Sequence, residues 1–289
     1  MYNDQYSTLK DKIHIINNGI TIDKFMYPIK KSQNRFIYSS CSERGLQKLL
    51  ELWPQIIEHL PDAELYITTY NDFPRDDNER NMEKIIYQHS SITHLGKLEQ
   101  SKLYELIASV EYWLYPSYWP ETSCITCMEM LMSEVVCLYY PVSGLINSLG
   151  EYGIKISEGN EIDALLELTM KKKSELRKKG KLYATSCSWG NREKEWSNVL
   201  RIGTTYSGTH STTSTEFTSS TAPLTTSSSQ FTTDSKKNIY FYVNNRFILP
   251  PLLDYFDSLK EKYNVIYTSN VSDLDSVSHS IILFVICHL

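Results

Sequence analysis

The sequence has no long apolar run and no leading signal segment. Its longest apolar run, Ile281 to Cys287, is far shorter than the roughly 20 residues that a transmembrane helix needs. Its first residues, Met1 to Gln5, do not form the basic and then apolar pattern of a secretory signal peptide. We therefore expect neither a membrane span nor secretion.

An excess of positive charge is also lacking. The 29 Lys and Arg residues are outnumbered by 34 Asp and Glu residues, and the formal net charge is −5. Residues 1–203 hold 24 basic and 27 acidic side chains and the remainder holds 5 and 7, so neither part is basic. Nucleic-acid-binding domains usually present a basic face. We therefore expect no nucleic-acid partner.

Cysteine is sparse and does not form a metal-binding pattern. The six cysteines follow no disulfide-framework spacing, which is typical of a protein from a reducing compartment. Cys124 and Cys127 form a single C-x-x-C pair, without the second pair that a four-ligand zinc site needs. Neither a G-x-G-x-x-G motif nor a P-loop is present. We expect a cytoplasmic protein that holds no metal or other cofactor.

The sequence does contain enough apolar residues for a globular core, and it divides into parts. Apolar residues make up 41% of the 289 residues, close to ordinary globular composition. From residue 204 to 234, however, 20 of 31 residues are Ser or Thr. Such a segment buries too little apolar surface to offset the entropy lost on ordering. We therefore predict a domain at 1–203, a flexible linker at 204–236 and a second unit at 237–289.

The first domain alternates strand-like and helix-like segments. Short apolar runs predict strands at 35–39, 63–68, 92–95, 112–115 and 135–140. Apolar residues at helical spacing predict helices at 45–59 (bent or broken near Pro54), 80–89, 101–109, 123–133, 162–179 and 191–202. The basic side chains between Lys171 and Lys181 are expected to form a solvated helix face. Repeated βα units with short connections indicate an α/β fold with a doubly wound, parallel, Rossmann-like sheet.

The part after the linker begins in the same way. Strands are predicted at 238–243, 265–269 and 280–287, and a helix at 249–263. About fifty residues are too few for a complete doubly wound sheet of ordinary domain size. We expect a partial second α/β unit that is not stable by itself.

A pair of glutamates, Glu121 and Glu129, flanks the start of a predicted helix. Glu121 comes shortly after the strand at 112–115, and ligands of doubly wound sheets bind where the strands end. A carboxylate accepts two hydrogen bonds at once and therefore suits the paired hydroxyls of a ribose or hexose. Free N–H groups at a helix start suit a phosphate. Here they belong to the residues near Ser123, Cys124 and Ile125.

Six landmarks between residues 13 and 202 follow one another in a recognisable order. They are Ile16 to Ile20 with Asp23 and Phe25; Arg44 to Leu46 with Leu49, Leu50, Trp53 and Pro54; Ile92 to Gly96; Pro116, Ser117 and Glu121; Glu129 to Ser133; and Ser143 to Leu145. Together they resemble the C-terminal, nucleotide-sugar-binding half of GT-B fold glycosyltransferases. The matching motifs of those enzymes are, in the same order, "PNGID…F", "KG…LL…WP", "V.FLG", "PS…E", "EAMA" and "GGL". Among these, the sequence is most similar to the retaining family 4, in the style of its giant-virus members.

The resemblance implies a role for each matching position. Arg44, directly before Gly45, stands where the family's lysine grips the diphosphate of the donor. Glu129 stands where a glutamate holds the ribose hydroxyls, and Glu121 where a glutamate meets the donor sugar. Arg44 and Glu121 are thus the implied catalytic residues. The implied reaction transfers a sugar from a nucleotide diphosphate sugar to an acceptor hydroxyl.

The remaining implied donor-binding positions lie at the same edge of the sheet. Backbone N–H groups of Cys124 and Ile125, at the helix start beside Ser123, would face the phosphates. Gly96 and Lys97 would lie beside the base. Catalysis in this class rests on stabilising the leaving diphosphate with cations and N–H donors, so the resemblance implies no metal.

Three departures from the family pattern lower the expected activity. Tyr38 to Ser40 replaces the family's Gly-Arg pair, so one of two usual cations is missing. Glu134 replaces a common glycine. The resemblance begins at residue 13, so the sequence holds no counterpart of the acceptor-binding half. We expect little transfer by this chain alone, and activity only when a separate acceptor-domain chain is present.

Two other functions stay open at this point. In the first, the chain is a non-catalytic module that binds a nucleotide sugar, or an inactive remnant of a longer enzyme. In the second, it is an interaction protein that uses only the sheet scaffold, because a fold does not determine a function.

Overall fold

The computed structural model describes several stretches of the chain. They are residues 16–25, 27–70, 73–202, 238–243, 260, 264–268 and 281–285. Residues 17–194 form one compact unit, and the strands after residue 237 belong to a second. The predicted linker at 204–236 lies outside the described residues, as does nearly all of the predicted helix at 249–263.

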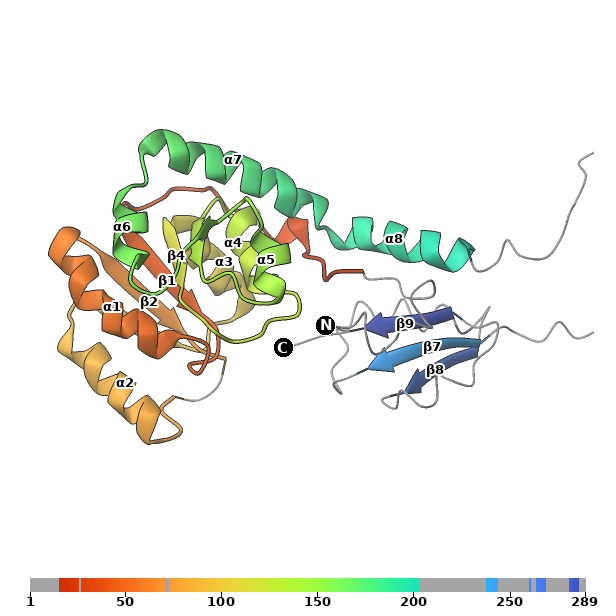
Figure 1. Ribbon diagram of the computed structural model, residues 1–289, viewed down its shortest axis with the longest axis horizontal. Coiled ribbons are helices and arrows are strands. Elements are labelled where there is room, and N and C mark those ends of the chain that lie inside the picture. The colour runs from red at the N-terminus through yellow and green to blue at the C-terminus, as the bar shows by residue number, and fades with distance from the viewer. Residues whose placement is uncertain are drawn as a thin grey trace, which may run out of the picture. The chain divides into compact units, whose positions relative to one another are not determined.

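A six-stranded parallel sheet forms the centre of the first unit (Figure 1). Its strands are β1 (Arg35–Ser39), β2 (Glu64–Thr68), β3 (Ile92–Gly96), β4 (Tyr112–Tyr115), β5 (Val136–Tyr139) and β6 (Ile154–Lys155). Their spatial order is β3-β2-β1-β4-β5-β6, and every neighbouring pair is parallel. The chain therefore runs outward from β1 to β3, returns to β4 and runs outward again to β6. The predicted doubly wound parallel sheet is confirmed, with its order reversing between β1 and β4.

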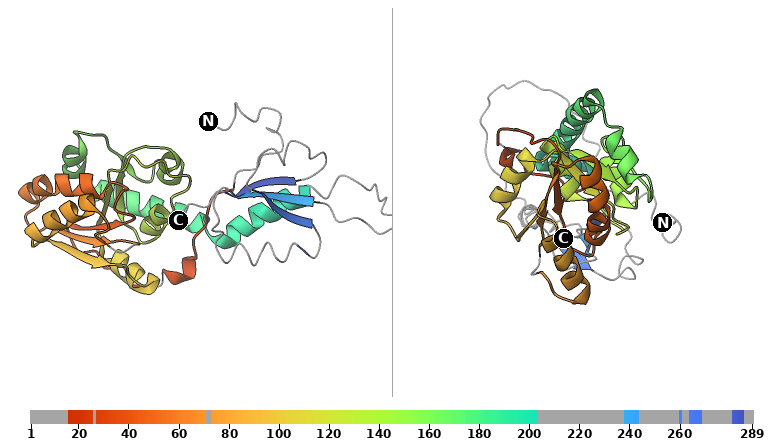
Figure 2. Two further views of the ribbon diagram at one scale, coloured as in Figure 1. Left: turned by 90° about the horizontal axis from the view of Figure 1, so that it is seen from below. Right: turned by 90° about the vertical axis from the view of Figure 1, so that its left-hand side faces the viewer.

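Helices cover both faces of this sheet (Figures 1 and 2). Helices α1 (Leu46–His59) and α2 (Asp77–Gln88) lie against one face, and α3 (Gln100–Ser109) and α4 (Ile125–Met132) against the other. Every residue of β4 and β5 is buried as a result. This explains why these strands are continuous runs of apolar and aromatic residues rather than alternating ones.

Two predicted helices differ from those in the structure. Helix α1 continues through Pro54 without ending there. Helix α2 begins earlier than predicted, because the Asp76 side chain accepts a hydrogen bond from the Glu79 N–H and so caps the helix start. Cap residues set helix ends more sharply than apolar spacing does.

The single helix predicted at 162–179 is in fact two helices. These are α6 (Glu161–Leu166) and α7 (Met170–Ser186). Thr169 begins α7 by accepting a hydrogen bond from the Lys172 N–H. Helix α8 (Trp189–Ile202) follows, and α5 (Gly144–Leu149) and the short β6 were not predicted.

A buried ion-pair network joins α7 to the amino ends of β1 and β4. Glu111, directly before β4, accepts hydrogen bonds from Lys173 Nζ and Arg177 Nη2, each at 3.0 Å, and from the Asn34 N–H at 2.8 Å. Lys173 also donates to the Tyr112 hydroxyl (2.9 Å). The prediction of a solvated basic face is therefore wrong for Lys173 and Arg177, whose side chains are only 9% and 17% exposed. A buried carboxylate needs such partners to offset its lost hydration.

The first and last described segments of this unit lie side by side. Ile20 pairs with Ser188 in a parallel bridge. The Ile20 N–H donates to the Cys187 carbonyl (2.9 Å), and the Trp189 N–H donates to the Ile20 carbonyl (3.1 Å). Main-chain hydrogen bonds thus join the beginning of this unit to the segment between α7 and α8.

The second unit contains a three-stranded parallel sheet. Its strands are β7 (Asn238–Val243), β8 (Asn264–Thr268) and β9 (Ile281–Val285), in the order β8-β7-β9. All three strands were predicted from the sequence. Parallel pairing of strands this close in sequence requires crossover connections, as in an α/β unit.

Candidate functional site

Arg44 and Glu121 meet at the carboxyl edge of the sheet. Doubly wound folds bind ligands at this edge, where the strand order reverses. The chain leaving β1 reaches Arg44 just before α1, and the chain leaving β4 reaches Glu121 just before α4. Arg44 Nη1 lies 3.3 Å from Glu121 Oε1, and the two side chains are 11% and 5% exposed. The two predicted catalytic residues are therefore in direct contact across the β1/β4 reversal.

Two glycines allow the loops that hold these residues to approach closely. Gly45 has φ of +99°, and a Cβ there would lie 2.8 Å from the Pro116 carbonyl oxygen. The Gly144 N–H donates to the Glu121 carbonyl oxygen (2.7 Å). A Cβ at Gly144 would collide with the carbonyl oxygens of Glu121 and Thr122. The loops after β1, β4 and β5 are thus in backbone contact around Glu121.

Arg44 is held as a cation between Glu121 and an aromatic ring. Its guanidinium carbon lies 5.2 Å from the centre of the Trp119 ring, within range of a cation–π attraction. Burial opposes its charge, but nearby groups, led by the Glu121 carboxylate, leave the pKa of Arg44 above its ordinary value. The Tyr115 hydroxyl donates to the same Glu121 oxygen, Oε1, at 3.3 Å. Both contacts lie on one oxygen of the carboxylate.

Glu129 is a second buried carboxylate at this edge, and its hydrogen-bond donor is a neutral hydroxyl, whereas Glu121 contacts a cation. It lies on α4 and is 8% exposed. The Tyr104 hydroxyl donates to its Oε1 (2.7 Å), and the Tyr104 ring packs against that of Phe25, with centroids 4.3 Å apart. Burial raises the pKa of Glu129 to about 7, although the Tyr104 hydrogen bond and the positive charge of Lys24 act in the opposite direction. Its carboxyl therefore changes charge near neutral pH.

The predicted phosphate-facing N–H groups lie at the start of α4. Ile125 is the first residue of this helix, and first-turn N–H groups have no acceptors within a helix. The Cys124 N–H already donates to Ser148 Oγ (3.3 Å). The Ser123 carbonyl accepts a hydrogen bond from Asn18 Nδ2 (3.5 Å). Helix α4 thus presents the N–H of Ile125, while Cys124 has an internal acceptor.

Gly96 is the last residue of β3 and Lys97 follows it, two strands away from β1 on the same edge. Gly96 has φ of +64°, and its carbonyl accepts a hydrogen bond from the Thr69 N–H (3.1 Å). Lys97 is exposed. The Tyr70 hydroxyl, after β2, lies 3.3 Å from Thr126 Oγ1 on α4. Both strand ends therefore lie along the edge that holds Arg44.

Sequence reasoning missed the tyrosines and the second arginine around this edge. Tyr104 contacts Glu129 across 25 residues, a separation that leaves no spacing pattern in the sequence. Tyr115 lies only six residues before Glu121, but it is one of several aromatic residues in a buried strand, so its contact with Glu121 has no separate signal. Arg75 Nη2 donates to Glu43 Oε2 (3.0 Å) next to Arg44.

Arg75 itself forms ion pairs with Glu43 and Glu79. Its Nε donates to Glu79 Oε1 (3.0 Å) and Oε2 (3.2 Å), and its Nη2 donates to Ser42 Oγ (3.1 Å). The hydrogen bonds from Arg75 lower the pKa of Glu79 to about 2. Arg75 thus serves mainly to hold α2 against the loop after β1.

Metal binding and membrane insertion find no support in the described residues. Within these, no three His, Cys, Asp or Glu side chains come together as a metal site. In the same part of the chain, no helix is long and apolar enough to cross a membrane.

Several solved glycosyltransferase structures resemble this chain. HepE from Anabaena in complex with UDP-glucose matches 65% of this chain and 57% of its own, with 15% identity and a TM-score of 0.53. Sucrose-phosphate synthase from Thermosynechococcus elongatus matches 70% of this chain and 57% of its own, with 15% identity and a TM-score of 0.56. This is the Rossmann-like fold of GT-B glycosyltransferases.

The likeness to GT-B glycosyltransferases covers only part of each known structure. A glycosyltransferase from Rickettsia africae matches 68% of this chain and 59% of its own, with 17% identity and a TM-score of 0.54. The chain thus spans less than two thirds of the length of these proteins. No family model and no curated protein matches the sequence. The GT-B likeness therefore rests on the three-dimensional arrangement.

Proposed function

We propose that the first unit binds a nucleotide diphosphate sugar and holds it for transfer to an acceptor hydroxyl. The Arg44–Glu121 contact across the β1/β4 reversal is the observation that supports this most directly. HepE was solved with UDP-glucose, which makes a UDP sugar the first donor to test. A closer relationship to family 4 and its giant-virus members is part of the proposal and rests on the ordered sequence landmarks.

In this proposal Arg44 and the start of α4 bind the diphosphate. A guanidinium has five N–H donors, and in this proposal Arg44 donates to phosphate oxygens as well as to Glu121. The Ile125 N–H and the positive end of the α4 dipole add to the attraction. Both would stabilise the leaving diphosphate as the glycosidic bond breaks, which is the main catalytic requirement of the reaction. No metal is part of this proposal.

Glu121 and Glu129 would bind the hydroxyls of the donor. Arg44 and Tyr115 both contact Oε1 of Glu121, so Oε2 is the oxygen we assign to the sugar. Glu129 would accept hydrogen bonds from the ribose hydroxyls, with Gly96 and Lys97 beside the base. A buried carboxylate with a strongly raised pKa is typical of functional sites.

Calorimetric titration of the full chain with UDP, UDP-glucose and uridine tests this proposal. Arg44→Ala should weaken UDP binding far more than uridine binding, since it removes a phosphate contact. Glu129→Ala should weaken both. Each loss should cost about 1.5–3 kcal/mol, the usual value of a charge-assisted hydrogen bond.

Glu167→Ala is the matched control for this titration. Glu167 is exposed and caps the end of α6, so its loss should leave binding unchanged. The proposal fails if no nucleotide diphosphate binds, or if Glu167→Ala weakens binding as much as Glu129→Ala does.

A second candidate function is donor binding without transfer. The engagement of Arg75 by Glu43 and Glu79 favours it, because this leaves Arg44 to act on the diphosphate without help from Arg75. The measurement is sugar release and transfer from the bound donor, with and without an added acceptor-domain chain. Binding with no transfer under either condition supports a donor-binding module, and transfer that is lost in Glu129→Ala supports an enzyme.

A further inference from the structure

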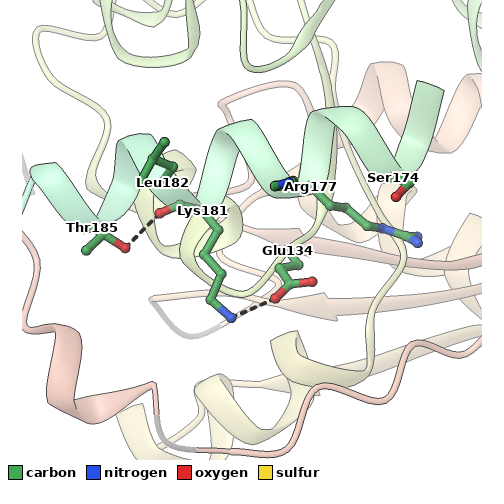
Figure 3. A pocket seen from close by; sticks show the side chains of 7 residues that line it. Glu134, Ser174, Arg177, Lys181, Leu182 and Thr185 are labelled. Carbon is green, nitrogen blue, oxygen red and sulfur yellow. Dashed lines mark hydrogen bonds and ion pairs between the residues drawn. The ribbon is translucent and has the colours of Figure 1, made fainter. Parts of the chain in front are cut away.

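A hollow of about 580 Å³ lies beside α7 (Figure 3). Its polar lining includes Glu134, Ser174, Arg177, Lys178 and Lys181. Glu134 comes just before β5, at the amino end of that strand. The candidate donor site instead follows the carboxyl ends of β1 and β4. The two places therefore use opposite edges of the same sheet.

The hollow has more positive than negative charge. Helix α7 contains seven basic side chains and one acidic one, although the whole chain has a net charge of −5. Three cations line the hollow, Arg177, Lys178 and Lys181, together with one carboxylate, Glu134. Glu111, the carboxylate partner of Arg177, is shared with Lys173.

The positive charge of Arg177 also affects a neighbouring lysine, Lys31. Lys31 Nζ donates to the Ile107 carbonyl (3.1 Å). Its pKa falls to about 7, first because it is buried and second because Arg177 repels its charge. The attraction of Glu134 and Glu111 only partly compensates. An anion placed near Arg177 would relieve this repulsion.

Glu134 positions Lys181 at the border of the hollow. Lys181 Nζ lies 2.6 Å from Glu134 Oε1 (Figure 3). An ammonium has three N–H donors, so Lys181 can still donate to a second anion. Glu134 has φ of +59°, in the left-handed region that favours glycine. The glutamate is thus present despite backbone strain, and its side chain orients a cation.

We propose that this hollow is a binding site for a phosphomonoester group, independent of the donor site. Arg177, Lys178 and Lys181 donate to the phosphate oxygens, and the Ser174 hydroxyl adds a neutral donor. A phosphomonoester carries nearly two negative charges and three acceptor oxygens at neutral pH, which balances three cations beside one carboxylate. Leu182, 75% exposed in the lining, contacts the organic part of the ligand.

Two probes distinguish a soluble ligand from a lipid headgroup. The first is glycerol 3-phosphate, titrated into the full chain by calorimetry. The second is a phosphatidylcholine vesicle with or without phosphatidic acid, measured by co-sedimentation. Both probes carry the same phosphomonoester chemistry. Each is measured with the wild-type chain and with Arg44→Gln, which removes the competing phosphate contact at the donor site.

The decisive comparison uses two charge-matched double variants of α7. Lys178→Gln with Lys181→Gln removes two cations from the hollow. Lys171→Gln with Lys172→Gln removes two exposed cations of the same helix that do not line it. We expect affinity for the bound probe to fall at least about tenfold in the first variant, the effect of losing charge-assisted contacts. The second variant should bind nearly as the wild type does.

Each outcome decides the proposal. This pattern with glycerol 3-phosphate supports the site and assigns it to a soluble ligand; the pattern with phosphatidic acid vesicles alone assigns it to a lipid headgroup. Equal losses in the two double variants would show a general attraction to the helix and overturn the proposal. Loss of binding in Arg44→Gln, or no binding of either probe, would also overturn it. None of these results depends on whether the chain binds a nucleotide sugar.

Discussion

Two buried carboxylates at opposite edges of the sheet differ in how they are compensated. Glu111, at the amino edge, is 4% exposed and accepts hydrogen bonds from two cations and a backbone N–H. Glu129, near the carboxyl edge, is 8% exposed and has the neutral Tyr104 hydroxyl as its donor. Burial raises the pKa of Glu129 to about 7. Similar burial thus accompanies two very different electrostatic environments.

The difference separates a structural carboxylate from a candidate functional one. Glu111 joins β1, β4 and α7 through charges that satisfy one another. Glu129 retains an ionisable group in a place where ionisation is unfavourable, which lowers stability unless a ligand uses the group. The comparison can be tested by changing each side in turn.

The largest effect is expected at the amino edge. Glu111→Gln should lower the free energy of unfolding by about 3–5 kcal/mol, because Lys173 and Arg177 would lose their buried counter-charge. Urea denaturation measures this change. Glu167→Gln, on an exposed position, should change stability by no more than about 0.5 kcal/mol. A loss at Glu111 as small as this control would remove the distinction between the two edges.

Glu129→Gln should have the opposite sign and depend on pH. The folded carboxyl keeps its proton up to about pH 7, whereas the unfolded one releases it near its ordinary pKa of 4.5. The free energy of unfolding of the wild type therefore falls as the pH rises from 4.5 to 7. Glutamine imitates the protonated form, so the variant should be more stable at pH 8, by at most about 3 kcal/mol.

Urea denaturation of the Glu129→Gln variant at pH 5 and pH 8 checks this expectation. The gain should shrink to less than about 1 kcal/mol at pH 5, where the folded carboxyl is protonated and the unfolded one is only partly ionised. A variant that is less stable than the wild type at both pH values would show that Glu129, like Glu111, is a well-compensated structural residue.

Tyr104→Phe should have a smaller effect, again dependent on pH. The Tyr104 hydroxyl donates to Glu129 Oε1, and a hydrogen bond to a charged acceptor is stronger than one to a neutral acceptor. The loss in unfolding free energy should be about 1.5 kcal/mol at pH 8 and about half of that at pH 5. NMR titration of Glu129 should show its pKa rising further in this variant. An unchanged pKa would mean that this hydrogen bond does not support the carboxylate.

The smallest effect concerns nucleotide binding and rests on the proposed function. If ionised Glu129 binds the ribose hydroxyls, affinity for UDP should increase about fivefold as the pH rises through 7, a gain of about 1 kcal/mol from charging the acceptor. Calorimetry at pH 5.5 and 8 measures this. Glu129→Gln should bind weakly and without that pH dependence. A variant that retains the wild-type pH profile would assign the titration to another group.

Much of the fold could be predicted from the sequence because its main elements have strong periodic signals. The strands β4 and β5 are short, fully buried runs, and α1 shows six buried residues on one face. These signals, with the breaks between them, predict the doubly wound sheet. Helix α5 has only six residues and β6 has two, which is too short for any period to appear. Local capping by Thr169 divided what looked like one helix.

For the candidate site, the positions of the charged residues could be predicted from the sequence, but the contacts around them could not. Arg44 and Glu121 follow strands, so topology alone brings them to one edge. Several contacts that set the electrostatics of buried groups join residues that are distant in sequence: Arg44 lies 77 residues from Glu121, Tyr104 lies 25 residues from Glu129, and, outside the site, Glu111 lies 62 residues from Lys173. No spacing rule connects such residues. Burial and pKa shifts depend on these contacts and therefore become visible only in three dimensions.

The main-chain bonds between Ile20 and residues 187–189 mean that the polypeptide enters and leaves this domain at a single point. A domain whose ends are adjacent can be inserted into another chain or circularly permuted with little change to its fold. Segments on either side of it can be lengthened, exchanged or relocated by recombination without pulling the sheet apart. Arg44 and Glu121 both lie between these two ends, so we expect their contact to survive changes in the segments attached outside them.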